Sequence, residues 1–185
     1  MKLIIGTALA LLIAIPLLIL AQEQRSPYAG QEVRNIKSLS DAEVQGYLQG
    51  RGMGLAKPAE LNSYPGPMHV LELSQQLQLT DDQRAATQRN FEQMSAEAIR
   101  LGRSFVEKEA ELNRLFGDAR VDSANLQRLV GETARLQGEL RLSHLRAHLQ
   151  MRAILTPQQI TRYNELRGYG TNTADAPRHH HGHQP

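Results

Sequence analysis

The stretch LTDDQ at residues 79–83 returns as LTPQQ at residues 155–159, so the chain carries the pattern L-T-x-x-Q twice. The shared positions are Leu79, Thr80, Gln83, Leu155, Thr156 and Gln159. A threonine followed three residues later by a glutamine is a capping box, in which the hydroxyl accepts from a backbone N–H and the amide reaches back to the threonine N–H. Each copy therefore predicts the start of a helix. Pro157 supports the second start, because a proline at the first helical position loses no hydrogen bond.

Two long helices are expected to follow the first copy. Apolar residues recur every three or four positions over residues 81–116 and again over 123–154, which is typical of helices that pack along one apolar stripe. In the second helix this stripe is predicted to continue from Leu140 through Leu145 and Leu149. Gly117 should end the first helix and Asp122 should cap the second. Two helices of similar length, roughly 50 Å each, joined by so short a turn predict an all-α fold built on an antiparallel hairpin.

Short helices are expected to flank this hairpin. The sequence SDAE at residues 40–43 is a further capping box, so a helix should run from there to about Gln49. Residues 50–67 have the composition of a loop, and loops of this length are often functional. Another short helix of about two to three turns is predicted from Met68 on, closing before Leu79, and a last one from residue 157 to about 167. The helical domain is thus placed at residues 40–168, between a flexible linker at 22–39 and a disordered tail at 169–185.

The N-terminal residues 1–21 have the pattern of an export signal or a membrane anchor. Residues 3–21 are almost wholly apolar, follow Lys2 and precede a polar stretch. Their length fits both a cleaved signal peptide and a helix that stays in the inner membrane. Both alternatives predict that the helical domain works outside the cytoplasm.

The composition argues against several classes of protein. Without cysteine, a metal site has to be built from His, Met, Asp or Glu. The 21 basic and 19 acidic residues give a net charge of +2, which falls to +1 when Lys2 is removed with the leader, and such a balance argues against a nucleic-acid-binding protein. The chain has no catalytic glycine loop or zinc-protease motif, so we expect neither an enzyme nor a required cofactor. A thin hairpin with few aromatic residues buries little surface alone, which predicts a homodimer.

The two motifs, the hairpin between them and the apolar leader resemble the LTxxQ-motif periplasmic family, over about residues 66–168. This family includes the Spy and CpxP chaperone-like proteins and the CnrX-like heavy-metal sensors. The resemblance implies a periplasmic, ATP-independent chaperone, a dimeric cradle that protects unfolded or stressed envelope proteins. The alternative is a heavy-metal sensor or metal-resistance protein, which binds a transition-metal ion and signals to a membrane partner.

Histidines supply the candidate metal ligands. His144 and His148 lie four residues apart and Met151 follows three residues later, so all three project from one face of the predicted helix. Imidazole and thioether donors suit zinc, copper, nickel or cobalt. His69, with Met68 and Glu72 of the same short helix before the first motif, is the candidate for the further ligands. The simpler alternative is that these side chains only fill the hairpin surface or a dimer contact.

The resemblance does not carry the sensor-type metal site over directly. In the CnrX-like sensors a His-x-x-x-Met pair lies just before the second motif, and Met151 matches its methionine. Ala147, however, stands where the histidine of that pair would be. The tail is predicted to bind transition metals weakly, as any flexible histidine-rich peptide does, through His179, His180, His181 and His183.

The second long helix also carries a candidate client-binding surface. Residues 128–139 hold alternating Arg and Glu at helical spacing, which predicts a solvated salt-bridge ladder. Beyond it the basic residues have no acidic neighbour in the sequence, and leucines lie between them. The resulting apolar strip with a basic rim suits partly unfolded chains, although a dimer core would produce the same pattern. The surface comprises Arg141, Leu142, Leu145, Arg146, Leu149 and Arg152.

Overall fold

The computed structural model describes residues 26–169 of the 185, and all regular structure in this part is helical. The predicted export segment and the tail histidines lie outside the described residues. Residues 26–32 belong to a separate compact unit and form consecutive turns. From residue 33 on, the second unit contains the helices α1 (Asp41–Leu48), α2 (Lys57–Glu60), α3 (Pro67–Glu72), α4 (Asp81–Gly117), α5 (Ser123–Ile154) and α6 (Pro157–Leu166).

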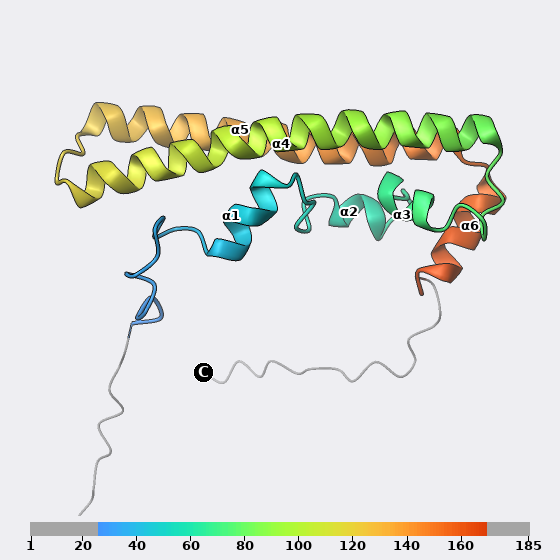
Figure 1. Cartoon of the computed structure of the whole chain (residues 1–185), viewed down its shortest axis with the longest axis horizontal. Coiled ribbons are helices and arrows are strands. Elements are labelled where there is room, and N and C mark those ends of the chain that lie inside the picture. The colour runs from blue at the N-terminus through green and yellow to red at the C-terminus, as the bar shows by residue number, and fades with distance from the viewer. Residues whose placement is uncertain (1–25, 170–185) are drawn as a thin grey trace, which may run out of the picture. The chain divides into compact units, whose positions relative to one another are not determined.

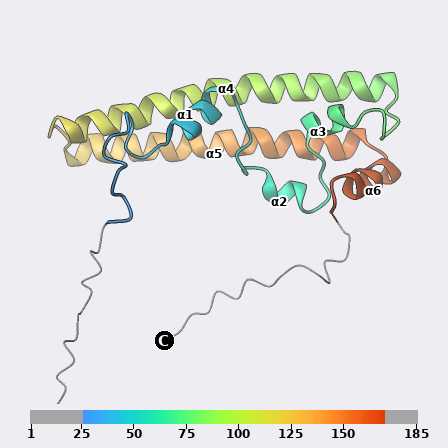
Figure 2. The ribbon, with the colours of Figure 1, turned by 60° about the horizontal axis from the view of Figure 1, so that its bottom comes forward.

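The two long helices form the predicted antiparallel hairpin. Figure 1 shows α4 and α5 side by side in opposite directions, with α1, α2 and α3 along the hairpin and α6 at one end, and Figure 2 shows the same arrangement from another side. Asp122 caps α5 in a capping box with Asn125, as its position predicts. The turn before it uses Ala119 with φ +53°, whereas Gly117 is still helical. The all-α hairpin expected from the sequence is confirmed.

The two L-T-x-x-Q copies meet at the open end of this hairpin. Thr80 and Thr156 each form the predicted capping box with Gln83 and Gln159. The two glutamine amides also bond to each other, with Nε2 to Oε1 distances of 2.8 and 2.9 Å. Each amide donates in addition to a backbone carbonyl of the neighbouring segment, at 3.0 and 3.2 Å. The repeat therefore both starts two helices and joins the segments that contain them.

The first hydrophobic core lies between α1, α4 and α5. It consists of Ile36, Leu39, Ala98, Leu101, Phe105, Leu136 and Leu140. The close approach of α1 depends on Gly102, because a Cβ at this position would overlap the carbonyl oxygen of Tyr47. The segment before α1 was expected to be a flexible linker up to residue 39, yet Ile36 and Leu39 are buried in this core. Apolar burial thus holds its last residues against the hairpin.

The second hydrophobic core closes the other end of the unit, where α3, α5 and α6 meet. It consists of Val70, Leu77, Met151, Leu155, Ile160 and Tyr163. Tyr163 and Met151 are fully buried there. Leu155 and Ile160 share the cluster, so the residue before the second cap packs with the first turn of α6.

Three local expectations are wrong. The buried stripe of α5 continues from Leu140 through His144, Ala147 and Met151, whereas Leu149 is 61% exposed and Leu145 is half-buried. The helical period explains this, because steps of four, three and four residues keep one face toward α4. The expected loop at 50–67 contains the single-turn helix α2, which has Pro58 in its first turn. Helix α3 ends at Glu72, and turns take the chain from there to Leu79.

Among the helices of residues 26–169, none combines the length and the hydrophobicity that a membrane crossing requires.

Candidate functional site

A pocket of about 690 Å³ lies where the segments before the first motif cover the hairpin. Its wall is formed by the loop 50–54, by α2, by the start of α3 and by side chains of both long helices. Both His144 and His148 line it. The stripe of α5 that should have been filled by leucines therefore presents two imidazoles to a cavity.

His148 is held in one tautomer by the backbone. Its Nδ1 lies 2.7 Å from the carbonyl oxygen of Tyr64, and because a carbonyl can only accept, Nδ1 carries the proton. The lone pair is then on Nε2, which is the arrangement of a metal-ligating histidine whose other nitrogen donates to a carbonyl. The side chain is 11% exposed, so the ring is fixed by packing as well.

His144 has an unsatisfied nitrogen inside the protein. The residue is 3% exposed, and its Nε2 is buried without a hydrogen-bond partner in the part of the chain that the structure describes. Burial, with a smaller contribution from His148, lowers the pKa of His144, which favours the neutral form of the imidazole. An unpaired buried polar atom costs about 1–3 kcal/mol. A ligand at this nitrogen would relieve that cost.

Glu60 lies beside His148 and connects the pocket to the C-terminal segment. Its Oε1 accepts from the hydroxyls of Tyr163 at 2.6 Å and Tyr169 at 3.1 Å, and Arg167 Nε is 3.5 Å away. Burial, and then the bond to Glu60, raises the pKa of Tyr163, so the hydroxyl remains a donor. The other oxygen, Oε2, is buried without a hydrogen bond among the described residues, 3.6 Å from His148 Nδ1. Of the two carboxylate oxygens, Oε1 thus accepts two hydrogen bonds and Oε2 accepts none from the described residues.

Gly66 leaves the edge of the His148 imidazole open. A Cβ on Gly66 would lie 3.3 Å from His148 Nε2 and 3.4 Å from Glu60 Oε2, which is tight, whereas one on Gly52 would make an ordinary contact of 3.8 Å with His144 Nδ1. Any larger residue at position 66 would fill the space between the two side chains. Gly66 and Glu60 fall within or beside the predicted loop, where nothing in the sequence marks them as site residues. The only signal was the unusual length of that loop.

Of the other predicted ligands, Met151 lies outside the pocket and His69 lies at its rim. Met151 is fully buried in the second core and does not line the pocket. His69 lines the rim, and its Nδ1 lies 2.9 Å from Glu72 Oε2. Within residues 26–169, no three His, Asp or Glu side chains are placed to hold one ion together. A complete site therefore needs either another type of donor or a movement of side chains.

The predicted client-binding surface is only partly free. Leu142 and Leu149 are 43% and 61% exposed, and Arg141 is exposed beside them. Arg152 instead donates to the Ser63 carbonyl oxygen at 2.8 Å and lies over the Tyr64 ring at 4.8 Å from its centroid. The arginine at the end of the strip therefore holds the loop that also fixes His148.

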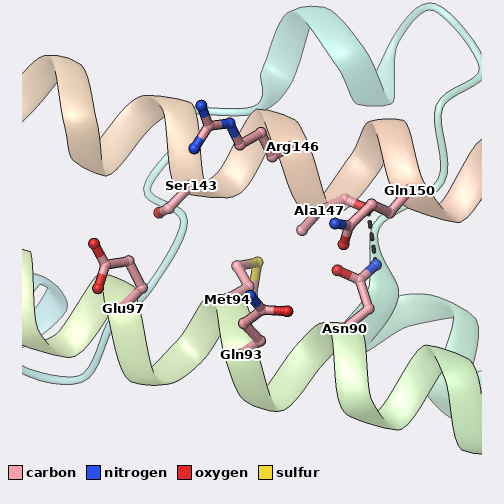
Figure 3. A pocket seen from close by; sticks show the side chains of 8 residues that line it. All are labelled: Asn90, Gln93, Met94, Glu97, Ser143, Arg146, Ala147 and Gln150. Atoms are coloured by element: carbon pink, nitrogen blue, oxygen red, sulfur yellow. Dashed lines mark hydrogen bonds between the residues drawn. The ribbon is translucent and has the colours of Figure 1, made fainter.

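The remaining arginine of this surface, Arg146, lines a small cavity of about 110 Å³ between the long helices. Figure 3 shows Ser143 and Ala147 of α5 on the side toward Glu97, Met94 and Asn90 of α4, whereas the guanidinium of Arg146 extends away from α4. Asn90 Nδ2 donates to the Ala147 carbonyl oxygen at 2.9 Å, as the dashed line in Figure 3 shows. This hydrogen bond fixes the two helices at the level of the histidines.

Comparison with known proteins identifies the family of the chain. A family model described as heavy-metal resistance matches residues 45–162. The chain belongs to this family. The heavy-metal resistance family is part of the LTxxQ and CnrX-like group, and the matched range contains both motifs, the pocket histidines and Glu60. No curated protein and no solved structure matches the chain significantly. Membership of the heavy-metal resistance family favours the metal-related alternative over the chaperone.

Proposed function

We propose that the protein binds a transition-metal ion in the pocket beside α4 and α5, as a metal-resistance or metal-sensing protein of the cell envelope. One observation carries the proposal: two imidazoles one helical turn apart line the same pocket, His148 with its proton held on Nδ1 and His144 with a buried, unpaired Nε2. Neutral imidazole is the form that binds zinc, copper, nickel and cobalt. Membership of the heavy-metal resistance family supports the same ligand class.

The proposal includes a cellular setting. The apolar leader supports export to the periplasm, with or without a retained anchor. There the protein would bind the ion without catalysis and without ATP. It would either signal metal binding to a membrane partner or sequester the metal. Glu60 supports such coupling, because it contacts both His148 and the segment that leads into the histidine-rich tail.

The test is a metal titration of the full-length chain with glutamine at the four tail histidine positions, which removes the weak tail site. We expect saturable binding of about one ion per protomer for at least one of the four metals, since two fixed imidazoles provide the core of a site. A His144→Gln, His148→Gln variant should lose this binding, while the matched His69→Gln variant should keep it. Thermal unfolding must show that all variants are folded. Undiminished saturable binding by the double variant would disprove the proposal.

A second candidate is the chaperone function, which is supported by the exposed Leu142 and Leu149 beside Arg141 and Arg146. Replacing both leucines with serine and both arginines with glutamate should abolish suppression of client aggregation, if this face holds clients through apolar burial and charge. Arg152 must stay unchanged in that experiment, because its loss would disturb the loop at Ser63 and Tyr64. Unchanged suppression of aggregation would exclude this surface as the binding face.

A further inference from the structure

The pocket that carries the proposed metal site also contains thioether donors. Met53, Met68 and Met94 line it, which is three of the five methionines of the chain. Thioether sulfur is a soft donor that favours copper(I) and similar ions, in contrast to the oxygen donors that hard cations prefer.

Met94 has the best position of the three. It lies half-buried on α4 and lines both the main pocket and the small cavity between the long helices. Figure 3 shows its side chain extending from α4 toward α5, close to the turn of Ser143 and Ala147. His144 follows Ser143 directly and lines the main pocket with Met94. Two helices, joined at this level by the Asn90 hydrogen bond to Ala147, thus hold the thioether in the pocket that both imidazoles line.

The other two methionines are less suited. Met53 is 43% exposed, and its sulfur packs over Gly46, where a Cβ would overlap it. Met68 is 46% exposed at the rim of the pocket. Exposed and flexible side chains lose more conformational entropy when they bind an ion. Met94 is therefore the thioether that the fold has already oriented.

The charges around the pocket favour a singly charged ion. The wall includes three cations, Arg51, Lys57 and Arg167, and one buried carboxylate, Glu60. One oxygen of Glu60 already accepts from two tyrosine hydroxyls. An ion in this surplus of positive charge is repelled in proportion to its own charge, so a divalent ion is penalised twice as strongly as a monovalent one.

The number of available donors leads to the same ion class. A divalent ion such as zinc takes four ligands, commonly nitrogen and oxygen in a protein without cysteine. No three His, Asp or Glu side chains of residues 26–169 provide even most of that set. Copper(I) and silver(I) are satisfied by two or three soft or borderline donors, which is what two imidazoles and one thioether supply.

We infer that this pocket selects a soft monovalent cation, copper(I) or silver(I), held by His144, His148 and the sulfur of Met94. Glu60 lies beside the ion as a neighbouring charge that orients His148 and the C-terminal segment. The inference rests on the proposed function for the position of the site, and it goes further by naming the ion class and a third ligand.

Silver(I) is the probe for the test, because it has no competing redox chemistry under ordinary conditions. The full-length chain with glutamine at the four tail histidine positions is titrated with silver(I), zinc(II) and cobalt(II), each in competition with a chelator of known affinity. The expected result is one silver ion per protomer, bound more tightly than either divalent ion. Met94→Leu should weaken silver binding by roughly tenfold or more, since even loss of an outer-shell partner costs about 10–100-fold. Its affinity for zinc and cobalt should stay within the error of the titration.

Two matched controls make the result specific. Met151→Leu alters a methionine of the second core that does not line the pocket, and it should leave silver binding unchanged. The Met53→Leu, Met68→Leu double variant should also retain it. Leucine has nearly the volume of methionine, so all of these variants are expected to fold. X-ray absorption of the copper(I)-loaded protein should show one sulfur neighbour, and that sulfur should be missing in the Met94→Leu variant.

The outcomes separate this inference from the proposed function. Saturable zinc or cobalt binding that depends on His144 and His148, with weaker silver binding, overturns the inference and leaves the proposed function standing. Unchanged silver binding by Met94→Leu, or loss of silver binding in the Met53 and Met68 variant alone, also overturns it. Absence of any saturable binding refutes both.

Discussion

At the scale of single residues, the metal hypothesis depends on two buried polar atoms that form no hydrogen bond and could therefore interact with a ligand. His144 Nε2 and Glu60 Oε2 are both buried without a hydrogen bond among the described residues, and both belong to residues that line one pocket. Unsatisfied buried atoms are uncommon in folded proteins and call for an explanation. The transition-metal ion that we propose for this pocket would lie close to both atoms.

Gly66 provides a direct test of this arrangement. Its φ of −83° and ψ of 138° suit any residue, but a methyl group would lie 3.3 Å from His148 Nε2 and 3.4 Å from Glu60 Oε2. We therefore expect Gly66→Ala to fold and to weaken metal binding by roughly tenfold or more, because it covers the lone pair of a ligand. The measurement is the same competition titration, with thermal unfolding to confirm the fold. Gly131→Ala, which meets nothing within 4 Å, is the control. Equal affinities for the two variants would exclude His148 Nε2 as a ligand.

The motif glutamines show a different limit of sequence reasoning at this scale. Their role in capping follows from a spacing of three residues, whereas their reciprocal amide bonds join residues 76 positions apart. Nothing in either copy indicates that the two caps face each other. The two glutamines are in contact only because the hairpin brings both helix starts to the same end.

At the scale of elements, helix bounds were predictable because they are set locally. Capping boxes at Ser40, Thr80, Asp122 and Thr156 start the helices where the sequence places them. Short elements were harder to predict. Helix α2 has no side-chain cap and only one turn, so it exists through its contacts with the rest of the unit, and local propensity gives little warning of it.

The contact between α1 and α4 leads to a prediction about two glycines. Gly102 and Gly138 both lie inside long helices, yet a Cβ on Gly102 overlaps the Tyr47 carbonyl oxygen while one on Gly138 meets nothing. Gly138→Ala should raise the free energy of unfolding by about 0.5–1 kcal/mol through helix propensity. Gly102→Ala should lower it by about 1–3 kcal/mol, since α1 must move away from α4. Chemical denaturation measures both changes. A stabilising Gly102→Ala would show that α1 does not pack as described.

At the scale of the described unit, the hairpin is held by different interactions toward its two ends. The glutamine pair joins the helix starts at the motif end. Toward the turn, Lys108 and Glu111 of α4 form ion pairs with Glu132 and Arg128 of α5, at 2.9 and 2.8 Å. The predicted ladder on α5 thus extends across to the other helix. Its partly exposed charges are the ones that acid should affect first.

This network predicts loss of stability in acid. Arg128 lowers the pKa of Glu111, and Lys108 lowers that of Glu132, below the ordinary value of 4.5. Carboxylates with a lowered folded-state pKa stabilise the protein above their unfolded value, and this contribution is lost as the pH falls below it. Denaturation midpoints should therefore decrease from pH 5 to about pH 3, and less so for a Glu111→Gln, Glu132→Gln variant. Equal decreases in the denaturation midpoint of the unmodified protein and of the variant would show that the network does not contribute to stability.

The expected homodimer remains a prediction at this scale. Leu142 and Leu149 leave apolar area on one face of α5, and both a partner copy and a client would cover it. Sedimentation analysis of the full-length chain, with and without the two leucines changed to serine, distinguishes a dimer from a monomer.

The sequence by itself determined the helix starts, the hairpin and the two histidines on one helical face, because capping and periodicity act over a few neighbouring residues. Only the tertiary structure decided that these histidines face a pocket while Leu149 of the expected stripe is exposed. It also decided that the neighbours of His148 are Glu60, Tyr64 and Gly66, of which Tyr64 is more than eighty positions away in the sequence. The physical reason is that such contacts form by burial of the whole unit around the hairpin, and no local pattern encodes which loop residues that burial brings together.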